Sequence, residues 1–309
     1  MEQSPWDPEG VTPRLDASGT IVLADGAPDP TATIDLRGFY RAMVHARCLD
    51  LALARAGLPM WAPAAGEEAV TASCASLCDP NEWIYAGVRD QPALAMLRGV
   101  SPASVLAGHR DGARYRGAPG GASLPGVNLG HVPETLGLYL GLAAGHAHAL
   151  KLERAGQATV AIFGEGLTTV GLYRETVSLA VACDLPLVLL CKSQLWPEAA
   201  PAEAAVFGES VAERARAVGM GARRVDGADP VAVYEAIEWA LSRARYGRGP
   251  TLVEAVITQL IHPDVPGHRD PIERLRRHLD RAGQWTPTMQ DALEAELRGQ
   301  LPRDEEEAP

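Results

Sequence analysis

Lysine is almost missing from this chain of 309 residues. Of its 28 Lys and Arg residues, only Lys151 and Lys192 are lysines, a bias that we attribute to composition rather than to chemistry. Aromatic residues are also scarce, at 5%. No apolar run approaches the roughly 18–20 residues that cross a bilayer, and residues 1–16 lack a basic segment followed by an apolar one. We therefore expect no membrane span and a cytoplasmic location.

An excess of positive charge is absent as well. The formal net charge is −11 and the sequence pI is about 5.2. This argues against nucleic acid as a partner, because proteins that bind it carry a basic surface. The five cysteines are dispersed; Cys74 and Cys78 are spaced to share a helix face, but no second Cys or His pair completes a metal site. The cysteines are therefore predicted to be reduced residues of the core.

The remaining composition is typical of a folded protein, with 47% hydrophobic and 22% charged residues. Three parts can be distinguished along the chain. Residues 1–33 are rich in Pro, Gly and Asp, which predicts an extended N-terminal arm. Residues 34–285 are predicted to form the main domain, and residues 286–309 a C-terminal helix with an acidic tail.

Short apolar runs alternate with helical patterns through the main domain. The runs predicted to be strands are 158–163, 185–191, 223–225 and 251–257. A three/four spacing of apolar residues predicts helices at residues 34–56, 67–77, 136–152, 167–182, 209–218 and 230–246. Strands that are apolar on both faces and are separated by helices are typical of a parallel sheet. The predicted fold class is therefore α/β, with a doubly wound, mainly parallel sheet.

Two loops follow strands at the places where parallel sheets bind ligands. The first is Gly164-Glu165-Gly166, where the glycines let the backbone approach a ligand and the next helix N-terminus suits phosphate. Glu165 could hold a divalent cation there, although a plain tight turn explains the same residues. The second loop is Lys192-Ser193-Gln194. One helix and one strand separate the two loops, so we expect them side by side at one edge of the sheet.

These loops belong to a longer series of ordered motifs. The series comprises Phe39-Tyr40-Arg41-Ala42-Met43, Pro63-Ala64-Ala65-Gly66-Glu67-Glu68-Ala69, Arg89-Asp90, Gly164-Glu165-Gly166, Val225-Asp226-Gly227, Gly249-Pro250-Thr251-Leu252-Val253-Glu254-Ala255 and Asp270-Pro271-Ile272. From about Leu36 to Trp285 the chain thereby resembles the alpha subunit of the thiamine-diphosphate-dependent first component of 2-oxo acid dehydrogenase complexes, of the pyruvate, branched-chain or acetoin type. The resemblance implies the thiamine-diphosphate-binding fold.

The resemblance also implies a set of site residues. In the family, thiamine diphosphate is held through Mg²⁺ by a Gly-acid-Gly turn and a later pair of amide side chains. The residues of this chain that would take these roles are Glu165 and Gln194 at the metal, Gly164 and Gly166 at the diphosphate, and Arg89 at the phosphate charge. The segment whose backbone holds the aminopyrimidine ring corresponds to Leu136 and Gly137, or to residues 130–133, which compete for the same alignment. His262 is the candidate acid/base, with a solvent-exposed loop histidine as the alternative.

Several positions depart from the family pattern. Glu165 and Gln194 each add a methylene to the expected Asp and Asn, and Val88 replaces a tyrosine beside the diphosphate. Gln259 replaces an arginine, which removes a fixed positive fork from the anion. The loop at residues 263–269 is shorter than in the family. A compensating cation near Gln259 would favour an active enzyme, whereas a site filled by side chains would favour the alternative, an inactive scaffold that supports or regulates a partner subunit.

The resemblance finally implies a partner. The glutamate that activates the cofactor belongs to a separate beta subunit in this family, so the chain would supply half of an active site in an α₂β₂ heterotetramer. The acyl unit would pass to the lipoyl group of an acyltransferase or to another acceptor. The expected function is therefore that of the alpha-type subunit of a thiamine-diphosphate- and Mg²⁺-dependent 2-oxo acid decarboxylase/dehydrogenase.

Overall fold

A five-stranded sheet forms the centre of the protein. The computed structural model describes residues 8–23, 28–56, 62–110, 126–130, 135, 137–195, 210–261 and 264–300. The strands are β1 (Trp83–Tyr85), β2 (Thr159–Gly164), β3 (Leu187–Gln194), β4 (Gly221–Asp226) and β5 (Thr251–Ile257). Their order is β1-β2-β3-β5-β4, and each of these neighbouring pairs is parallel. The predicted α/β fold with a parallel sheet is confirmed.

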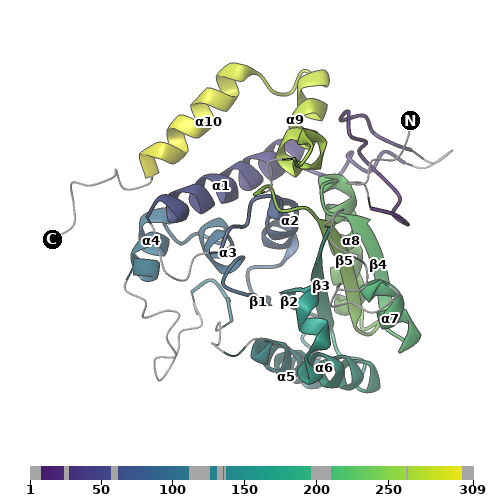
Figure 1. Cartoon of the computed structure of the whole chain (residues 1–309). Coiled ribbons are helices and arrows are strands. Elements are labelled where there is room, and N and C mark those ends of the chain that lie inside the picture. Colours follow the sequence, from purple (N-terminus) through teal and green to yellow (C-terminus); the bar gives the residue numbers. More distant parts are fainter. Residues whose placement is uncertain are drawn as a thin grey trace.

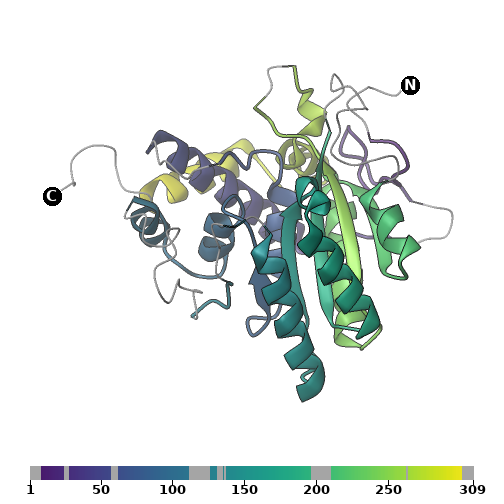
Figure 2. The ribbon, with the colours of Figure 1, turned by 60° about the horizontal axis from the view of Figure 1, so that its bottom comes forward.

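Helices connect the strands. They are α1 (Leu36–Arg55), α2 (Glu68–Leu77), α3 (Gln91–Leu97), α4 (Pro102–Arg110), α5 (Leu138–Glu153), α6 (Gly171–Ala182), α7 (Val211–Ala217), α8 (Pro230–Arg245), α9 (Pro271–Arg281) and α10 (Pro287–Gln300), with the 3₁₀ turns η1 (Glu165–Thr169) and η3 (Gly267–Arg269). A right-handed helical crossover between parallel strands places helices on the faces of a sheet. Figures 1 and 2 show α5 and α6 together on one face, with α1, α2 and α8 beyond the other.

The alternating side chains of the strands divide the core into two clusters. Val160, Ile162 and Leu190 point into the larger one, which also contains buried residues of α1, α2, α8 and α9. Ala161 and Leu189, their neighbours along the strands, point into the smaller one with α5, α6 and α7. Because successive side chains of a strand face opposite sides, both faces of β2 and β3 are buried. This is why these strands read as continuous apolar runs.

Local sequence explains where most elements begin and end. Helix α8 begins with Asp229 as its N-cap, whose side chain accepts a hydrogen bond from the Ala232 backbone N–H, and with Pro230 at its first position. Strand β5 has the predicted bounds. Helix α6 begins later than predicted because Val170 is extended (φ −81°, ψ 136°) and separates η1 from Gly171. The three-residue strand β1 was not predicted.

The N-terminal segment 8–23 lies against α8 and α9. Leu15 is fully buried, and the backbone N–H groups of Arg14 and Leu15 donate to Asp229 Oδ2 at 2.7 and 2.8 Å. Arg277 Nη1 of α9 donates to the Ala17 carbonyl at 2.8 Å. The described part of this segment is therefore tied to the start of α8 and to α9.

Among the described helices, none combines the length and the apolar character that crossing a membrane would require.

Candidate active site

The Gly164-Glu165-Gly166 turn lies at the carboxyl end of β2. Gly164 and Gly166 are exposed, and a Cβ atom added to either would meet no described atom within 4 Å. Glu165 is half-buried, and this burial raises the pKa of its carboxyl group although a hydrogen bond from the Gln194 backbone opposes the shift. The outer side of the turn is therefore open, and a carboxyl group stands beside it.

The second predicted loop is next to this turn. Gly164 of β2 is in register with Lys192 of β3, which confirms that the two segments are adjacent at one edge. The prediction of a loop at residues 192–194 is wrong, because these residues are the end of β3 and pair with β5. Ser193 Oγ donates to Glu254 Oε1 of β5 at 3.0 Å, so this hydroxyl is used within the sheet. Gln194 is half-buried, and its Nε2 has no hydrogen-bond partner among the described residues. The Gln194 amide thus keeps unused hydrogen-bonding capacity.

Arg89 comes from the loop between β1 and α3, at the same edge. Its side chain is 36% exposed, and its Nη1 lies 3.0 Å from Glu67 Oε1. Its Nε is buried and has no hydrogen-bond partner within the described ranges. A guanidinium group has five N–H donors. Glu67 therefore holds Arg89 through Nη1, and other N–H groups of the guanidinium are available to a ligand.

A buried ion cluster, which the sequence did not predict, connects these loops. Lys192 Nζ forms an ion pair with Glu67 Oε2 and a second one with Asp90 Oδ1 at 2.6 Å. The Lys192, Asp90 and Glu67 side chains are only 5%, 4% and 0% exposed. Burial alone would lower the pKa of Lys192, but the two carboxylates outweigh it and raise this pKa above its ordinary value. We name Glu67, Asp90, Lys192 and Arg89 the Glu67 cluster.

Gln259 joins this cluster from the loop after β5. Its Nε2 donates to Glu67 Oε1 at 3.0 Å, the oxygen that also accepts from Arg89. The position at which an arginine was expected thus binds the same carboxylate as Lys192 and Arg89. Two cations therefore lie near Gln259, but the carboxylates of Glu67 and Asp90 balance their charges.

Glu67 is placed by a tight loop. Gly66 has φ +100°, and a Cβ atom there would collide with the Thr258 carbonyl oxygen, so only glycine fits. The Leu260 N–H donates to the Ala65 carbonyl at 2.9 Å, which joins this loop to the loop that carries Gln259. The next residue, Glu68, pairs instead with Arg47 and has the structural role expected for a carboxylate at a helix start.

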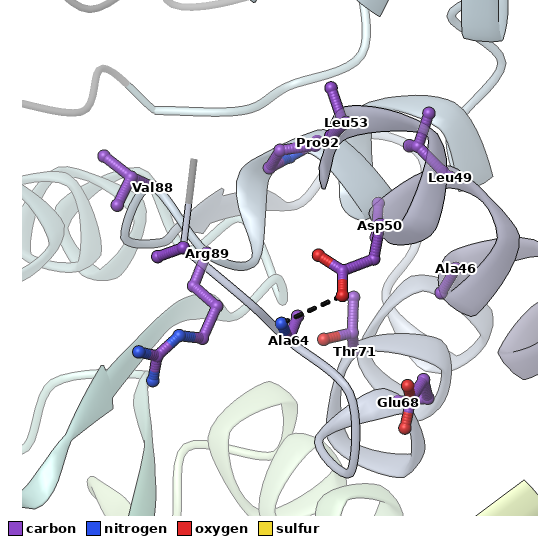
Figure 3. Close-up of a pocket in the computed structure, with 12 residues that line it drawn as sticks. Ala46, Leu49, Asp50, Leu53, Ala64, Glu68, Thr71, Val88, Arg89 and Pro92 are labelled. Atoms are coloured by element: carbon purple, nitrogen blue, oxygen red, sulfur yellow. Dashed lines mark hydrogen bonds between the residues drawn. The ribbon is translucent and has the colours of Figure 1, made fainter. Parts of the chain in front are cut away.

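A small pocket adjoins Arg89, between α1, α3 and the loop before α2 (Figure 3). Leu49, Leu53 and Pro92 form its apolar side, and Asp50 Oδ2 accepts from the Ala64 N–H at 3.2 Å. Figure 3 shows the Arg89 guanidinium directed away from Leu49 and Leu53. The volume of about 20 Å³ holds one water molecule. This pocket is therefore too small for a cofactor.

A known protein family shares the sequence of this region and of the sheet around it. The family is described as dehydrogenase E1 component, and it matches residues 40–262, which is more than half of the chain. This chain belongs to the dehydrogenase E1 component family. The predicted resemblance is confirmed, and with it membership of a thiamine-diphosphate family of oxidoreductases.

Curated E1 relatives are similar over most of their length. The 3-methyl-2-oxobutanoate dehydrogenase subunit alpha of Mycobacterium tuberculosis (strain H37Rv) is 29% identical over 283 residues, which cover 85% of this chain and 75% of that protein. The pyruvate dehydrogenase E1 component subunit alpha of Staphylococcus aureus (strain Mu50) is 28% identical over 294 residues, covering 88% of this chain and 77% of that protein. Both are named as alpha subunits of 2-oxo acid dehydrogenases, which favours an enzyme over an inactive scaffold.

The residues of this E1 chain fit a diphosphate and a divalent cation. Among the described residues no group of three or more His, Cys, Asp and Glu could hold a metal ion. Mg²⁺ with a bound diphosphate does not need such a group, since one or two carboxylates, phosphate oxygens and waters complete its octahedron. Glu165 offers a carboxylate to the cation, the Nε2 of Gln194 can donate to a diphosphate oxygen, and the open glycine turn leaves room beside them.

The remaining predicted site residues of the E1 chain divide into two groups. Gly137 precedes α5 with φ +86°, and a Cβ there would lie 3.0 Å from Leu167 of η1, which places it close to the glycine turn. Leu136 and His262 lie outside the described residues. The described part of the candidate site therefore comprises Gly137, the glycine turn, Gln194 and the Glu67 cluster.

Proposed function

We propose that this chain is the alpha-type subunit of a 2-oxo acid dehydrogenase that binds thiamine diphosphate through Mg²⁺. The observation that carries the proposal is the meeting of Glu165, Gln194 and Arg89 at the carboxyl edge of the parallel sheet. Glu165 and Gln194 would hold the metal, Gly164 and Gly166 would leave space for the diphosphate, and Arg89 would neutralise its charge.

When bound, thiamine diphosphate supplies the carbanion stabilisation that decarboxylation of a 2-oxo acid needs. The residues of this chain bind and orient it: Arg89 keeps donors for phosphate oxygens, and Gly137 would bring the backbone at the start of α5 to the aminopyrimidine ring together with Leu136. His262 is proposed as the residue that moves a proton during acyl transfer. The acceptor is a lipoyl group of an acyltransferase or another acyl acceptor.

We further propose that the chain acts with a beta-type subunit in an α₂β₂ assembly. The relatives are named as alpha subunits, and such a name implies a second kind of subunit. One face of α5 supports a protein contact: Leu138, Leu142 and Leu152 are 45%, 46% and 73% exposed, and their spacing places them on one side of the helix. An exposed apolar stripe of this kind is typical of an interaction surface.

The experiment is calorimetric titration of thiamine diphosphate and Mg²⁺ into this chain purified together with its beta-type partner. We expect micromolar binding that Glu165→Ala abolishes, because the substitution removes the carboxylate from the metal. Glu238→Ala, which removes an exposed carboxylate of α8, is the matched control and should bind like the unaltered protein. Absence of binding at millimolar cofactor would contradict the proposed function.

A further inference from the structure

The Glu67 cluster is electrically balanced only when Arg89 is included. Lys192 contacts both Glu67 and Asp90, so its single positive charge stands against two negative ones. Arg89 contributes the second positive charge through Glu67. Buried charges are stable only when they are paired. In the described structure, the charge of Arg89 is therefore already used to neutralise Glu67.

Arg89 is nevertheless the member of the cluster that can change partners. Its side chain is 36% exposed, whereas the other three are at most 5% exposed. Glu67 would keep two donors without Arg89, because Lys192 reaches its Oε2 and Gln259 its Oε1. The carboxylate therefore stays hydrogen-bonded when the guanidinium turns to another anion.

We propose that Glu67 is an internal anion of the diphosphate subsite, which competes with the diphosphate for Arg89 and thereby sets its affinity. The proposal rests on the proposed function, in which Arg89 binds the diphosphate. When Arg89 pairs with the ligand, Lys192 and Gln259 hold the Glu67 carboxylate in place through their hydrogen bonds. Glu67 is thus a positioning residue: it acts on the ligand through Arg89.

The test is calorimetric titration of inorganic pyrophosphate into this chain purified together with its beta-type partner, without metal and at fixed ionic strength. Glu67→Gln keeps the length of the side chain and removes the competing charge, so we expect pyrophosphate to bind about tenfold more tightly. Glu68→Gln is the matched control, since the neighbouring Glu68 is equally buried and pairs with Arg47 instead. Its affinity should stay within about twofold of that of the unaltered chain.

A double variant separates competition from a mere change in net charge. Arg89→Gln should weaken pyrophosphate binding, and in that background Glu67→Gln should bring no gain, because the group for which Glu67 competes is gone. A gain that persists without Arg89 overturns the proposal. So does equal or weaker binding by the single Glu67→Gln variant.

The outcomes also separate this inference from the proposed function. If Arg89→Gln weakens pyrophosphate binding but Glu67→Gln does not strengthen it, Arg89 binds the diphosphate as proposed, but Glu67 does not compete for it. If neither the unaltered chain nor any variant binds pyrophosphate, the inference about Glu67 is wrong, whereas the proposed function is decided by the separate titration with thiamine diphosphate and Mg²⁺. Should circular dichroism show that Glu67→Gln does not fold, Glu67→Asp replaces it. The shorter carboxylate lies farther from Arg89 and attracts it less, so about threefold tighter binding is expected.

Discussion

Two buried ion clusters lie at the carboxyl edge of the same sheet, and they differ in whether solvent can reach them. At the end of β4, Asp226 binds Arg269 Nη1 at 2.6 Å and Arg274 Nη1 at 2.9 Å. These two arginines are 0% and 4% exposed. In the Glu67 cluster, by contrast, Arg89 is 36% exposed. The first cluster is closed, and the second has one side open.

The difference in access separates a structural role from a binding role. Arg269 also donates to Thr258 Oγ1 and to the Val256 carbonyl, both at 3.2 Å, so its donors are used to join β5 to the segment before α9. Within the part of the chain that the structure describes, Arg89 donates to one residue, Glu67. A cation whose donors are satisfied within the chain holds the fold together, whereas one that keeps donors near solvent can bind an anion.

The largest expected effect is the loss of stability when the carboxylate of the closed cluster is removed. Asp226→Ala leaves two buried guanidinium groups without their carboxylate and should lower the free energy of unfolding by about 3–5 kcal/mol. Asp280→Ala is the control, because its ion pair with Arg276 has both side chains more than a third exposed and should contribute less than about 1 kcal/mol. Urea denaturation measures both. Similar losses for the two variants would contradict the structural role of the closed cluster.

The second-largest expected effect is a pH dependence of the free energy of unfolding, which arises from Asp229 near the closed cluster. Burial raises the pKa of Asp229 from 3.8 to about 6. Between these values the folded chain keeps a proton that the unfolded chain has lost, so stability falls as the pH rises through about 6. Relative to Asp229→Asn, the unaltered chain should lose about 2 kcal/mol of stability between about pH 4 and pH 7.

Urea titrations across this pH range measure the difference for Asp229. The variant also loses one acceptor for the Arg14, Leu15 and Ala232 N–H groups, which lowers its stability at every pH and does not alter the slope. A difference that stays constant with pH, or one that grows in the opposite direction, would show that Asp229 is not titrating as its burial requires.

The smallest effect on stability is expected for the open cluster. Arg89→Gln should lower the free energy of unfolding by about 1–2 kcal/mol, because one buried carboxylate loses its counter-charge. The loss should be smaller than for Asp226→Ala, since the guanidinium is partly solvated and Glu67 keeps Lys192 and Gln259. The same variant should weaken pyrophosphate binding. A loss of stability as large as that of Asp226→Ala would make the two clusters equivalent and break the comparison.

Sequence patterns predicted the sheet and the adjacency of its two glycine- and lysine-bearing segments because both depend on local order, although the second segment is the end of β3 and not a loop. The apolar run at Thr251–Ile257 gave the bounds of β5, and the succession of one helix and one strand placed Gly164 beside Lys192. Strand β1 was missed because three residues are too few for an alternating pattern to be visible.

The Glu67 cluster could not be predicted in the same way. Its central ion pair joins Glu67 and Lys192, which are 125 residues apart, and no spacing rule links such positions. One sign was available: Lys192 is one of two lysines and follows a fully apolar strand. This sign is lost when the scarcity of lysine is attributed to composition alone. A lysine buried after an apolar strand requires acidic partners, and this requirement would have pointed to the cluster.

The long separations in the Glu67 cluster also have a consequence for how the chain folds. Glu67 is hydrogen-bonded to Lys192, which is 125 positions further along the chain, and to Gln259, which is 192 positions further along. The entropy lost in closing such long loops makes these contacts slow to form. The helices can appear early, but the anion subsite requires β1, β3 and β5 to be in place together. During refolding from denaturant, the capacity to bind pyrophosphate should therefore return with the slowest phase, after the helical signal has recovered.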